Sequence, residues 1–321
     1  MHSFQEFSKI FEEKFNNRHF PFTPRSLYNS AEYILKLGGK RIRPVMCLMG
    51  NELFGEVIPD TFNVATAIEL FHNFTLIHDD IMDKAPLRRG VETVHTKFGE
   101  PTALLSGDVM LVMAYEYLNK VREDRLHKVL HIFNKTGREV CEGQQLDMNF
   151  EKQEDVSFDE YLGMIELKTS VLLAASLQLG GLLGGAGGGN QQHLYEFGKN
   201  LGIAFQVQDD YLDAFGDPGK FGKQVGGDIV SNKKTFLSIH TSEVISGKAL
   251  ITFKNLLQSQ QPDKVEKILG IYRESNVEQW AKKLKDEYLE KAMEHLEKIA
   301  VLAVRKKPLQ ELAEFLIHRQ N

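Results

Sequence analysis

Apolar residues recur with the period of an α-helix along nearly the whole chain, and the apolar stretches are too long to be strands. The pattern predicts helices over residues 26–37, 61–83, 101–121, 125–147, 158–183, from 191 onward and 277–304, with a shorter one ending near residue 54. The first 24 residues are expected to form a tail. No internal repeat or low-complexity linker divides the sequence, which predicts one all-α domain over residues 1–321.

The motif Asp-Asp-x-x-Asp occurs twice, each time at the end of an apolar helical run. Its members are Asp79, Asp80 and Asp83, then Asp209, Asp210 and Asp213. The first and last carboxylates of each copy share one helix face, where like charges repel by about 0.2–0.5 kcal/mol per pair. Carboxylate oxygens without nearby cysteine or paired histidine suit Mg²⁺. Its coordination shell is usually completed by waters and by the phosphate oxygens of a substrate. One copy alone would indicate a solvated acidic helix end, but two copies favour a Mg²⁺ site for a phosphorylated substrate.

Basic and glycine-rich segments accompany the acid motifs. The run from Gly38 to Pro44 opens a helix with cations and free N–H groups, so it is either an anion cradle or an ordinary basic turn. Arg88 and Arg89 would either neutralise the first acid motif or share a diphosphate with it. Lys168 lies on a largely apolar helix, where a snorkelling lysine is the simplest interpretation. Residues 215–223 form a loop that either closes over a polyanion or is simply solvated, and residues 180–189 are expected to form a flexible turn.

Charge and composition exclude several classes. The net charge is −5 and no long basic run occurs, so nucleic-acid binding is not indicated. The start lacks the pattern of a signal peptide, and no apolar run is expected to reach the 18 or so residues of a membrane span. A cytoplasmic protein is therefore expected. Cys47 and Cys141 lie in apolar helical contexts and are expected to be buried, reduced thiols.

Taken in order, the motifs between Gly38 and about Lys234 resemble those of the trans-isoprenyl diphosphate synthases, the polyprenyl synthetase family. They are Gly-Gly-Lys-x-x-Arg, Asp-Asp-x-x-Asp followed by Arg-Arg-Gly, Gly-Gln-x-x-Asp, Lys-Thr, and Phe-Gln-x-x-Asp-Asp-x-x-Asp. The resemblance implies a single large helical bundle of the isoprenoid synthase type, usually a homodimer, with the acid motifs facing each other across a deep central cavity. It also implies Mg²⁺-dependent head-to-tail condensation of isopentenyl diphosphate with an allylic prenyl diphosphate, releasing pyrophosphate.

The same resemblance implies residue roles. Three Mg²⁺ ions on the allylic diphosphate would be ligated by Asp79, Asp83 and Asp209, with Asp80, Asp210 and Asp213 as ligands or holders of metal-bound water. That diphosphate would also be bound by Arg88, Lys168, Lys223 and Lys233, and the isopentenyl diphosphate by Lys40, Arg43, His72 and Arg89. Thr169 and Gln206 would flank the developing cation, with Asp147 behind them. The loop before Lys223 is one residue longer than in the farnesyl synthases of higher organisms, so choosing Lys223 over Lys220 is a judgement, and nothing is assigned to the C-terminus.

Product length is expected to depend on residues four and five before Asp79, which are Thr75 and Phe74, with Phe71 deeper. At 1.5 Å per residue, Phe74 lies about 7–8 Å along the helix from Asp79, so bulk begins early in the pocket. This pattern is most similar to geranylgeranyl (C20) synthases, with farnesyl (C15) next. The alternatives are a longer-chain synthase for quinone side chains or a non-catalytic subunit of a two-component synthase. Terpene cyclisation is disfavoured because the second motif repeats the aspartates.

Overall fold

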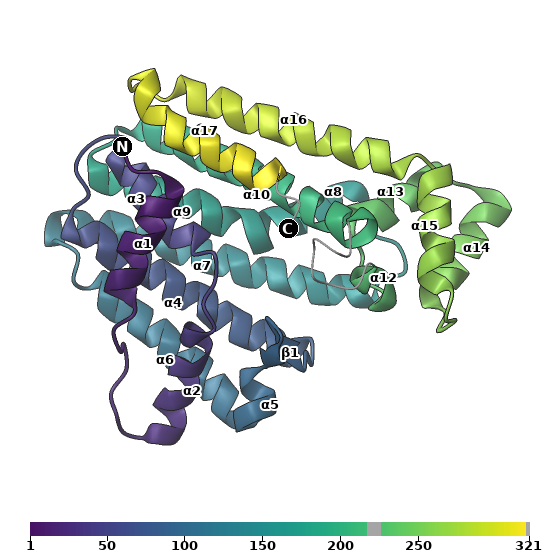
Figure 1. Cartoon of the computed structure of the whole chain (residues 1–321), viewed down its shortest axis with the longest axis horizontal. Helices are drawn as coiled ribbons and strands as arrows, with labels where there is room; N and C mark the ends of the chain where they lie inside the picture. The colour runs from purple at the N-terminus through teal and green to yellow at the C-terminus, as the bar shows by residue number, and fades with distance from the viewer. Residues whose placement is uncertain (217–225, 319–321) are drawn as a thin grey trace. The chain divides into compact units, whose positions relative to one another are not determined.

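The structure is a computed structural model that describes residues 1–216 and 226–318 (Figure 1). Its helices are α1 (Phe4–Phe15), α2 (Arg25–Lys36), α3 (Ile42–Glu52), α4 (Pro59–Met82), α5 (Val94–Phe98), α6 (Glu100–Leu118), α7 (Glu123–Lys152), α8 (Phe158–Ile165), the π-helical turn η1 (Glu166–Ser170), α9 (Val171–Gly184), α10 (Gly188–Phe215), α12 (Gly227–Val230), α13 (Phe236–Val244), α14 (Gly247–Gln258), α15 (Lys264–Glu274), α16 (Val277–Lys298) and α17 (Ala303–His318). The strands that the described residues form are β1 (Leu87–Arg88) and β2 (Val91–Glu92), a two-stranded antiparallel hairpin. The all-α prediction is confirmed.

The chain divides into two compact units, which are described separately. Unit 1 comprises Met1–Lys135, Ala175–Leu194 and Ile299–Pro308, and unit 2 comprises Thr136–Ala174, Tyr195–Lys298 and Leu309–Asn321. Helices α7, α9, α10 and α17 contribute residues to both units. The first acid motif belongs to unit 1 and the second to unit 2, and the prediction of a single domain stays a prediction.

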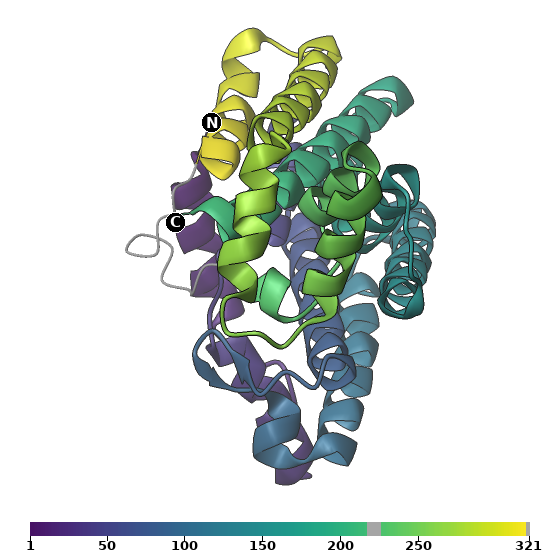
Figure 2. The ribbon, with the colours of Figure 1, turned by 90° about the vertical axis from the view of Figure 1, so that its right-hand side faces the viewer.

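Helix α4 is the central element of unit 1, because it packs along both α3 and α6. It begins with Pro59, whose missing N–H would have no partner within the helix at this position. The negative charge of Asp60 in the first turn interacts favourably with the helix dipole. Side chains are buried on nearly all sides of the helix, so most of it lies in the core of unit 1. The helix is exposed at its C-terminal end, where the acid motif finishes at Asp83. The β1–β2 hairpin lies next to α5 in both ribbon views (Figures 1 and 2).

Unit 2 combines α8, η1 and the later part of α10 with a C-terminal group of helices. Helices α14 and α15 pack side by side, and α13 packs against α8 and α16 (Figure 1). Helix α16 ends at Lys298, six residues earlier than the sequence pattern predicts. The reason lies just beyond, where the Ala300 N–H donates to the Asn190 side chain (2.8 Å) instead of continuing the helix.

The N-terminal tail contains a helix that the sequence analysis missed. Ser3 caps α1 by accepting a hydrogen bond from the Glu6 N–H, while the Glu6 carboxylate accepts from the Ser3 N–H. This capping box satisfies backbone donors that would otherwise lack partners. The helix then buries Phe7, Phe11 and Phe15, spaced four residues apart on one face. Residues 4–15 are therefore part of the core of unit 1 and not a tail.

The glycine-rich stretch was also interpreted wrongly in part. Gly180 and Gly184 lie within α9, and only the segment between α9 and α10 is a turn. A Cβ on Gly180 would lie 2.0 Å from the Cys47 carbonyl oxygen, and one on Gly184 would lie 2.5 Å from that of Asn51. These glycines are needed because the α9 and α3 backbones pack directly against each other, a contact between distant parts of the chain.

Two further expectations need correction. Cys47 and Cys141 are both free thiols, but only Cys47 is buried, since Cys141 lies on the exposed side of α7. The stretch Phe158–Gly184 is long and apolar enough to cross a membrane by length and composition, contrary to the sequence expectation. Within the structure 67% of its apolar window is buried, as in the core helix of a soluble protein, so it is weak evidence for a membrane span.

A half-buried histidine, His19, links α1 to α6 in unit 1. The His19 Nε2–H donates to the Phe15 carbonyl (2.8 Å), which leaves Nδ1 to accept from the Tyr117 hydroxyl (2.8 Å). Burial lowers the pKa of His19, although the carbonyl contact and Glu32 act in the opposite direction. The folded protein therefore favours the neutral ring.

We expect His19 to make unfolding pH-dependent. A lowered folded pKa means that the unfolded chain binds the extra proton more readily, so the contribution of His19 to stability is complete above about pH 6.5 and is lost as the pH falls from there through the folded pKa. Melting temperatures measured between pH 5 and 8 should fall less steeply toward acid for His19→Gln than for the wild type. Identical slopes for the two proteins would contradict this.

Candidate active site

The first acid motif places two carboxylates on one face of α4 and buries the third. Asp79 is half-buried and Asp83 is exposed at the helix end, one turn apart. Asp80 is only 2% exposed, and the Arg88 guanidinium donates to both of its oxygens, from Nε (2.7 Å) and from Nη2 (2.8 Å). Arg88 therefore forms an ion pair with Asp80, and the shared diphosphate, the other possibility for Arg88, stays a prediction.

The basic loop before α3 has an unusual backbone. Gly38 and Gly39 have φ values of 73° and 153°, and Arg41 is left-handed at 50°. The Arg89 guanidinium lies against this loop and donates to the Gly38 carbonyl oxygen. A Cβ on Gly39 would meet that guanidinium at 3.0 Å, so glycine leaves room for Arg89. The side chain of Lys40 is exposed at the same loop.

His72 faces this basic loop from α4. The Arg43 Nη1 donates to the His72 Nε2 (3.2 Å), which requires the ring to be neutral with its proton on Nδ1. Burial lowers the pKa of His72 well below its usual value, and Arg43, Arg89, Arg88 and Arg41 lower it further. Burial also lowers the pKa of Arg43 to about 10, which leaves it charged at neutral pH, and it lowers the pKa of Arg89. Unit 1 thus gathers Lys40, Arg43, His72 and Arg89, and their role as ligands of one substrate stays a prediction.

An aromatic row occupies the side of α4 next to the acid motif. The Phe74 ring packs on His78 (4.7 Å between centroids) and on Phe71 (5.6 Å), which in turn contacts Phe133. Gly107 of α6 lies under His78, where a Cβ would approach the ring to 2.3 Å. Phe74 therefore lies on the His78 side of the helix, while Thr75 shares the face of Asp79.

The second acid motif also buries its middle residue. Asp210 is 3% exposed and accepts hydrogen bonds from the Gln206 side chain (2.9 Å), the Phe236 N–H (3.0 Å) and the Tyr161 hydroxyl (3.4 Å). Burial raises the pKa of Asp210 to about 7, helped by the charge of Asp228 and opposed by these hydrogen bonds. Gln206, predicted to flank the developing cation, therefore also holds this carboxylate.

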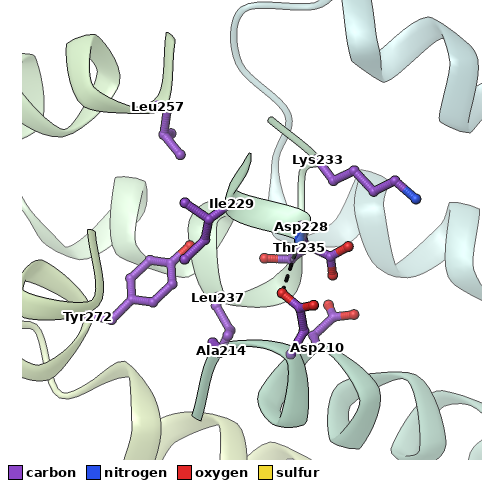
Figure 3. A pocket seen from close by; sticks show the side chains of 10 residues that line it. Asp210, Ala214, Asp228, Ile229, Lys233, Thr235, Leu237, Leu257 and Tyr272 are labelled. Carbon is purple, nitrogen blue, oxygen red and sulfur yellow. Dashed lines mark hydrogen bonds between the residues drawn. The ribbon is translucent and has the colours of Figure 1, made fainter. Parts of the chain in front are cut away.

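Asp228 is an acidic neighbour that the motif analysis did not select. Its N–H donates to the Asp213 carboxylate (3.0 Å), and both residues line a pocket of about 10 Å³, the size of one water molecule. Figure 3 shows the Asp210 and Asp228 carboxylates on one side of this pocket and Tyr272 on the other. The signal in the sequence was the pair Gly227-Asp228 shortly after the second motif. The sequence does not show that Asp228 lies next to Asp213, because this contact depends on the fold.

Lys233 and Lys234, which follow shortly after Asp228, make different contacts. The exposed Lys233 lies at the edge of the pocket of Figure 3 with its side chain extending away from it, and its role as a diphosphate ligand stays a prediction. The Lys234 ammonium donates to the carbonyl oxygens of Phe150 (2.6 Å) and Gln153 and thereby caps the C-terminal end of α7. Burial lowers the pKa of Lys234.

Lys168 and Thr169 lie in the π-helical turn η1, a feature often found at functional sites. The Lys168 ammonium donates to the Asp147 carboxylate at 2.5 Å. Gly143, one turn before Asp147, allows this approach, because a Cβ there would lie 2.3 Å from the Lys168 backbone nitrogen. On another side, a Cβ on Gly202 would lie 2.8 Å from Ser170. Gly143 and Asp147, the first and last residues of the motif Gly-Gln-x-x-Asp, thus hold Lys168 in place.

The carboxylates of the acid motifs are the candidate metal ligands. Among the described residues, no group of three or more His, Cys, Asp or Glu side chains forms a metal site by itself. Mg²⁺ commonly uses one or two carboxylates together with waters and substrate phosphates, and oxygen donors such as Asp79, Asp83 and Asp209 fit that chemistry. Lys223 lies outside the described residues.

Comparisons with known proteins agree with this chemistry. A geranylgeranyl diphosphate synthase from Methanosarcina mazei is 38% identical over 304 residues, covering 92% of this chain and 91% of the relative. A geranylfarnesyl diphosphate synthase from Natronomonas pharaonis is 39% identical over 238 residues, covering 68% and 70%. A crystal structure of a geranylgeranyl pyrophosphate synthase superimposes with a TM-score of 0.95 and 40% identity, covering 100% of each chain.

The match to the family itself extends through both acid motifs. Residues 24–275 match the polyprenyl synthetase family. This region contains the basic loop, the lysine of η1 and the residues that surround Asp210. The chain therefore belongs to the polyprenyl synthetase family.

Proposed function

We propose that this chain is a Mg²⁺-dependent prenyltransferase that joins isopentenyl diphosphate head-to-tail to an allylic diphosphate, making a short-chain prenyl diphosphate and releasing pyrophosphate. One observation carries the proposal. In unit 1, Arg43 and Arg89 donate to neutral acceptors, the His72 ring and the Gly38 carbonyl, so these contacts leave their positive charge uncancelled. Such preorganised guanidinium groups suit a diphosphate.

In the proposed binding mode, unit 1 holds isopentenyl diphosphate. Lys40, Arg43 and Arg89 supply charge, and the neutral His72 supplies its Nδ1–H as a donor. Arg88, Lys168, Lys233 and Lys223 hold the diphosphate of the allylic substrate. For Arg88 this means contacts beyond those to Asp80, and for Lys168 beyond those to Asp147.

Prenyl synthases of this family are generally Mg²⁺-dependent. Asp79, Asp83 and Asp209 would ligate three ions, and Asp80, Asp210 and Asp213 would ligate or orient water around them. When bound, the ions would neutralise the diphosphate and stabilise it as it leaves. The buried contacts of Asp80 and Asp210 favour the orienting role for these two.

The reaction balances without a redox partner. The C–O bond of the allylic diphosphate breaks, and its electron pair leaves with pyrophosphate. The double bond of isopentenyl diphosphate forms the new C–C bond, and the proton it loses goes to pyrophosphate. Thr169 and Gln206 would place oxygen dipoles beside the developing cation, and the basic side chains would stabilise the departing charge.

We propose a C20 product, with C15 next, limited by Phe74, Thr75 and Phe71. The aromatic row that joins Phe74 to Phe71 and His78 supports bulk at this depth. The names of the relatives range from geranylgeranyl to geranylfarnesyl diphosphate synthase, which supports a short chain. The cytoplasmic location stays a prediction.

We also propose a homodimer that forms through α6. Leu105 and Val112 lie two turns apart on that helix and are each 57% exposed, with Leu104 exposed beside them. An apolar stripe of this kind on a single helix face is typical of a surface that a partner covers. A second copy of this chain is the proposed partner.

The primary test is a product assay. Purified protein with Mg²⁺, labelled isopentenyl diphosphate and dimethylallyl, geranyl or farnesyl diphosphate should yield linear prenyl diphosphates that end mainly at C20. Asp79→Asn is the matched inactive control and should lower kcat/KM by about 10²-fold or more, because a charged ligand is replaced by a neutral one. If no primer is elongated by the wild type, the proposed reaction is wrong for the isolated chain.

Removing the aromatic bulk at Phe74 should lengthen the product. We expect Phe74→Ala to shift the main product by at least one five-carbon unit, measured by chromatography of the dephosphorylated alcohols. Phe62→Ala, on the same helix but 17 residues before Asp79, should leave the distribution unchanged. Unchanged product length in Phe74→Ala would show that this ring does not limit the chain.

Charging the α6 stripe should separate the subunits. We expect Val112→Glu to convert a dimer to a monomer in sedimentation velocity experiments at micromolar concentration, because a buried unpaired carboxylate is costly at an interface. Val304→Glu, at an exposed apolar position on α17, serves as the control. A monomeric wild type would contradict the proposal.

A further inference from the structure

Arg41 has no assigned role, although it lies between Lys40 and Arg43 in the basic loop. Its side chain is only 5% exposed, whereas that of Lys40 is exposed, so it points into unit 1. Its backbone is left-handed, an uncommon conformation for a residue with a Cβ. Residues in such conformations persist when their surroundings hold them in place, which directs attention to the contacts of the side chain.

The Arg41 guanidinium joins three segments of unit 1. Nη1 donates to the Glu69 carboxylate on α4, and Nη2 donates to the Leu35 carbonyl at the end of α2 (3.0 Å). The guanidinium also lies 5.0 Å from the centre of the Phe15 ring on α1, within the range of a cation–π contact. A single side chain thus ties the start of α3 to the middle of α4 and the end of α2.

Glu69 is equally constrained on the other side. It is 4% exposed, and its Oε1 also accepts from the Asn73 side chain (3.1 Å), which in turn donates to the Glu69 carbonyl (2.8 Å). Glu69 lies one helical turn before His72, the residue that accepts from Arg43. The ion pair therefore fixes the basic loop to the same turn of α4 that carries His72.

We infer that Arg41 and Glu69 are positioning residues that set the geometry of the isopentenyl diphosphate site. This inference rests on the proposed function, because it concerns the site made by Lys40, Arg43, His72 and Arg89. Neither residue touches the substrate. Because one cation pairs with one anion, the pair adds no net charge to the site, and its effect comes from where it holds the backbone between Lys40 and Arg43.

The proposal separates a positioning role from a merely structural one. Replacing both partners of a buried ion pair by apolar residues of similar size is often neutral or stabilising for the fold. The double variant Arg41→Met/Glu69→Leu should therefore melt near the wild-type temperature. It should nevertheless raise KM for isopentenyl diphosphate by about tenfold or more, the size of effect seen at metal sites when a residue that orients a ligand is lost. KM for the allylic diphosphate should stay within about twofold, because the Arg41 guanidinium contacts Glu69, Leu35 and Phe15 and not the described ligands proposed for that substrate.

Two matched variants complete the kinetic test. Arg41→Lys keeps the charge but loses the planar fork that reaches Glu69 and Leu35 together, so it should show the same selective rise in KM. Arg122→Met removes another arginine that pairs with an α4 carboxylate, that of Asp60, and should leave both KM values unchanged. A folded double variant with a wild-type KM for isopentenyl diphosphate, or with both KM values raised equally, would overturn the proposal.

Direct binding distinguishes failure of this inference from failure of the proposed reaction. Calorimetric titration of isopentenyl diphosphate into wild type and double variant needs no turnover. If the wild type binds it without condensing it, and the double variant binds about tenfold more weakly, the reaction is wrong and the positioning role stands. Equal affinities of the two proteins, or no binding by the wild type, overturn the positioning role.

Discussion

Burial of the middle aspartate in each acid motif is the constraint on which the rest of the candidate site depends. A carboxylate removed from water must be paired or hydrogen-bonded, and the two units meet this requirement differently. Asp80 receives both arms of the Arg88 guanidinium. Asp210 receives a backbone N–H at the start of α13, an amide and a phenol, and burial raises its pKa to about 7. In both motifs the buried residue anchors its helix through these contacts, whereas the outer aspartates are half-buried or exposed.

Close helix packing provides the second support. Gly143 lets α7 approach η1, and Gly202 lets α10 approach it from another side, so the turn that carries Lys168 is held between two backbones. A Cβ on Gly143 or Gly202 would clash with the π-helical turn, so only glycine fits at these two contacts. The position of the lysine is therefore determined by glycines whose importance comes from what faces them, as with Gly180 and Gly184 against α3.

The long helices could be predicted from sequence because each repeats its apolar pattern over many turns. The errors occurred where a contact between distant residues decides the outcome. Residues 180–184 contain glycines typical of a turn, but α3 holds them in a helix, and Asn190 ends α16 early. The missed helix α1 was different, since its Ser3-x-x-Glu6 cap and the phenylalanines spaced four apart were readable signals.

For the site, the motifs identified which residues take part but not how they share the work. The sequence motifs do not reveal the partners of Arg41, Arg43, Arg88 and Arg89, whereas the structure distinguishes these arginines by partner. Arg41 and Arg88 pair with the carboxylates of Glu69 and Asp80, and these contacts fix the loop and the helix end. Arg43 and Arg89 instead donate to a neutral ring and a carbonyl. Ion pairing thus stabilises the positions of the loop and helix, whereas Arg43 and Arg89, the proposed ligands of isopentenyl diphosphate, donate to neutral groups.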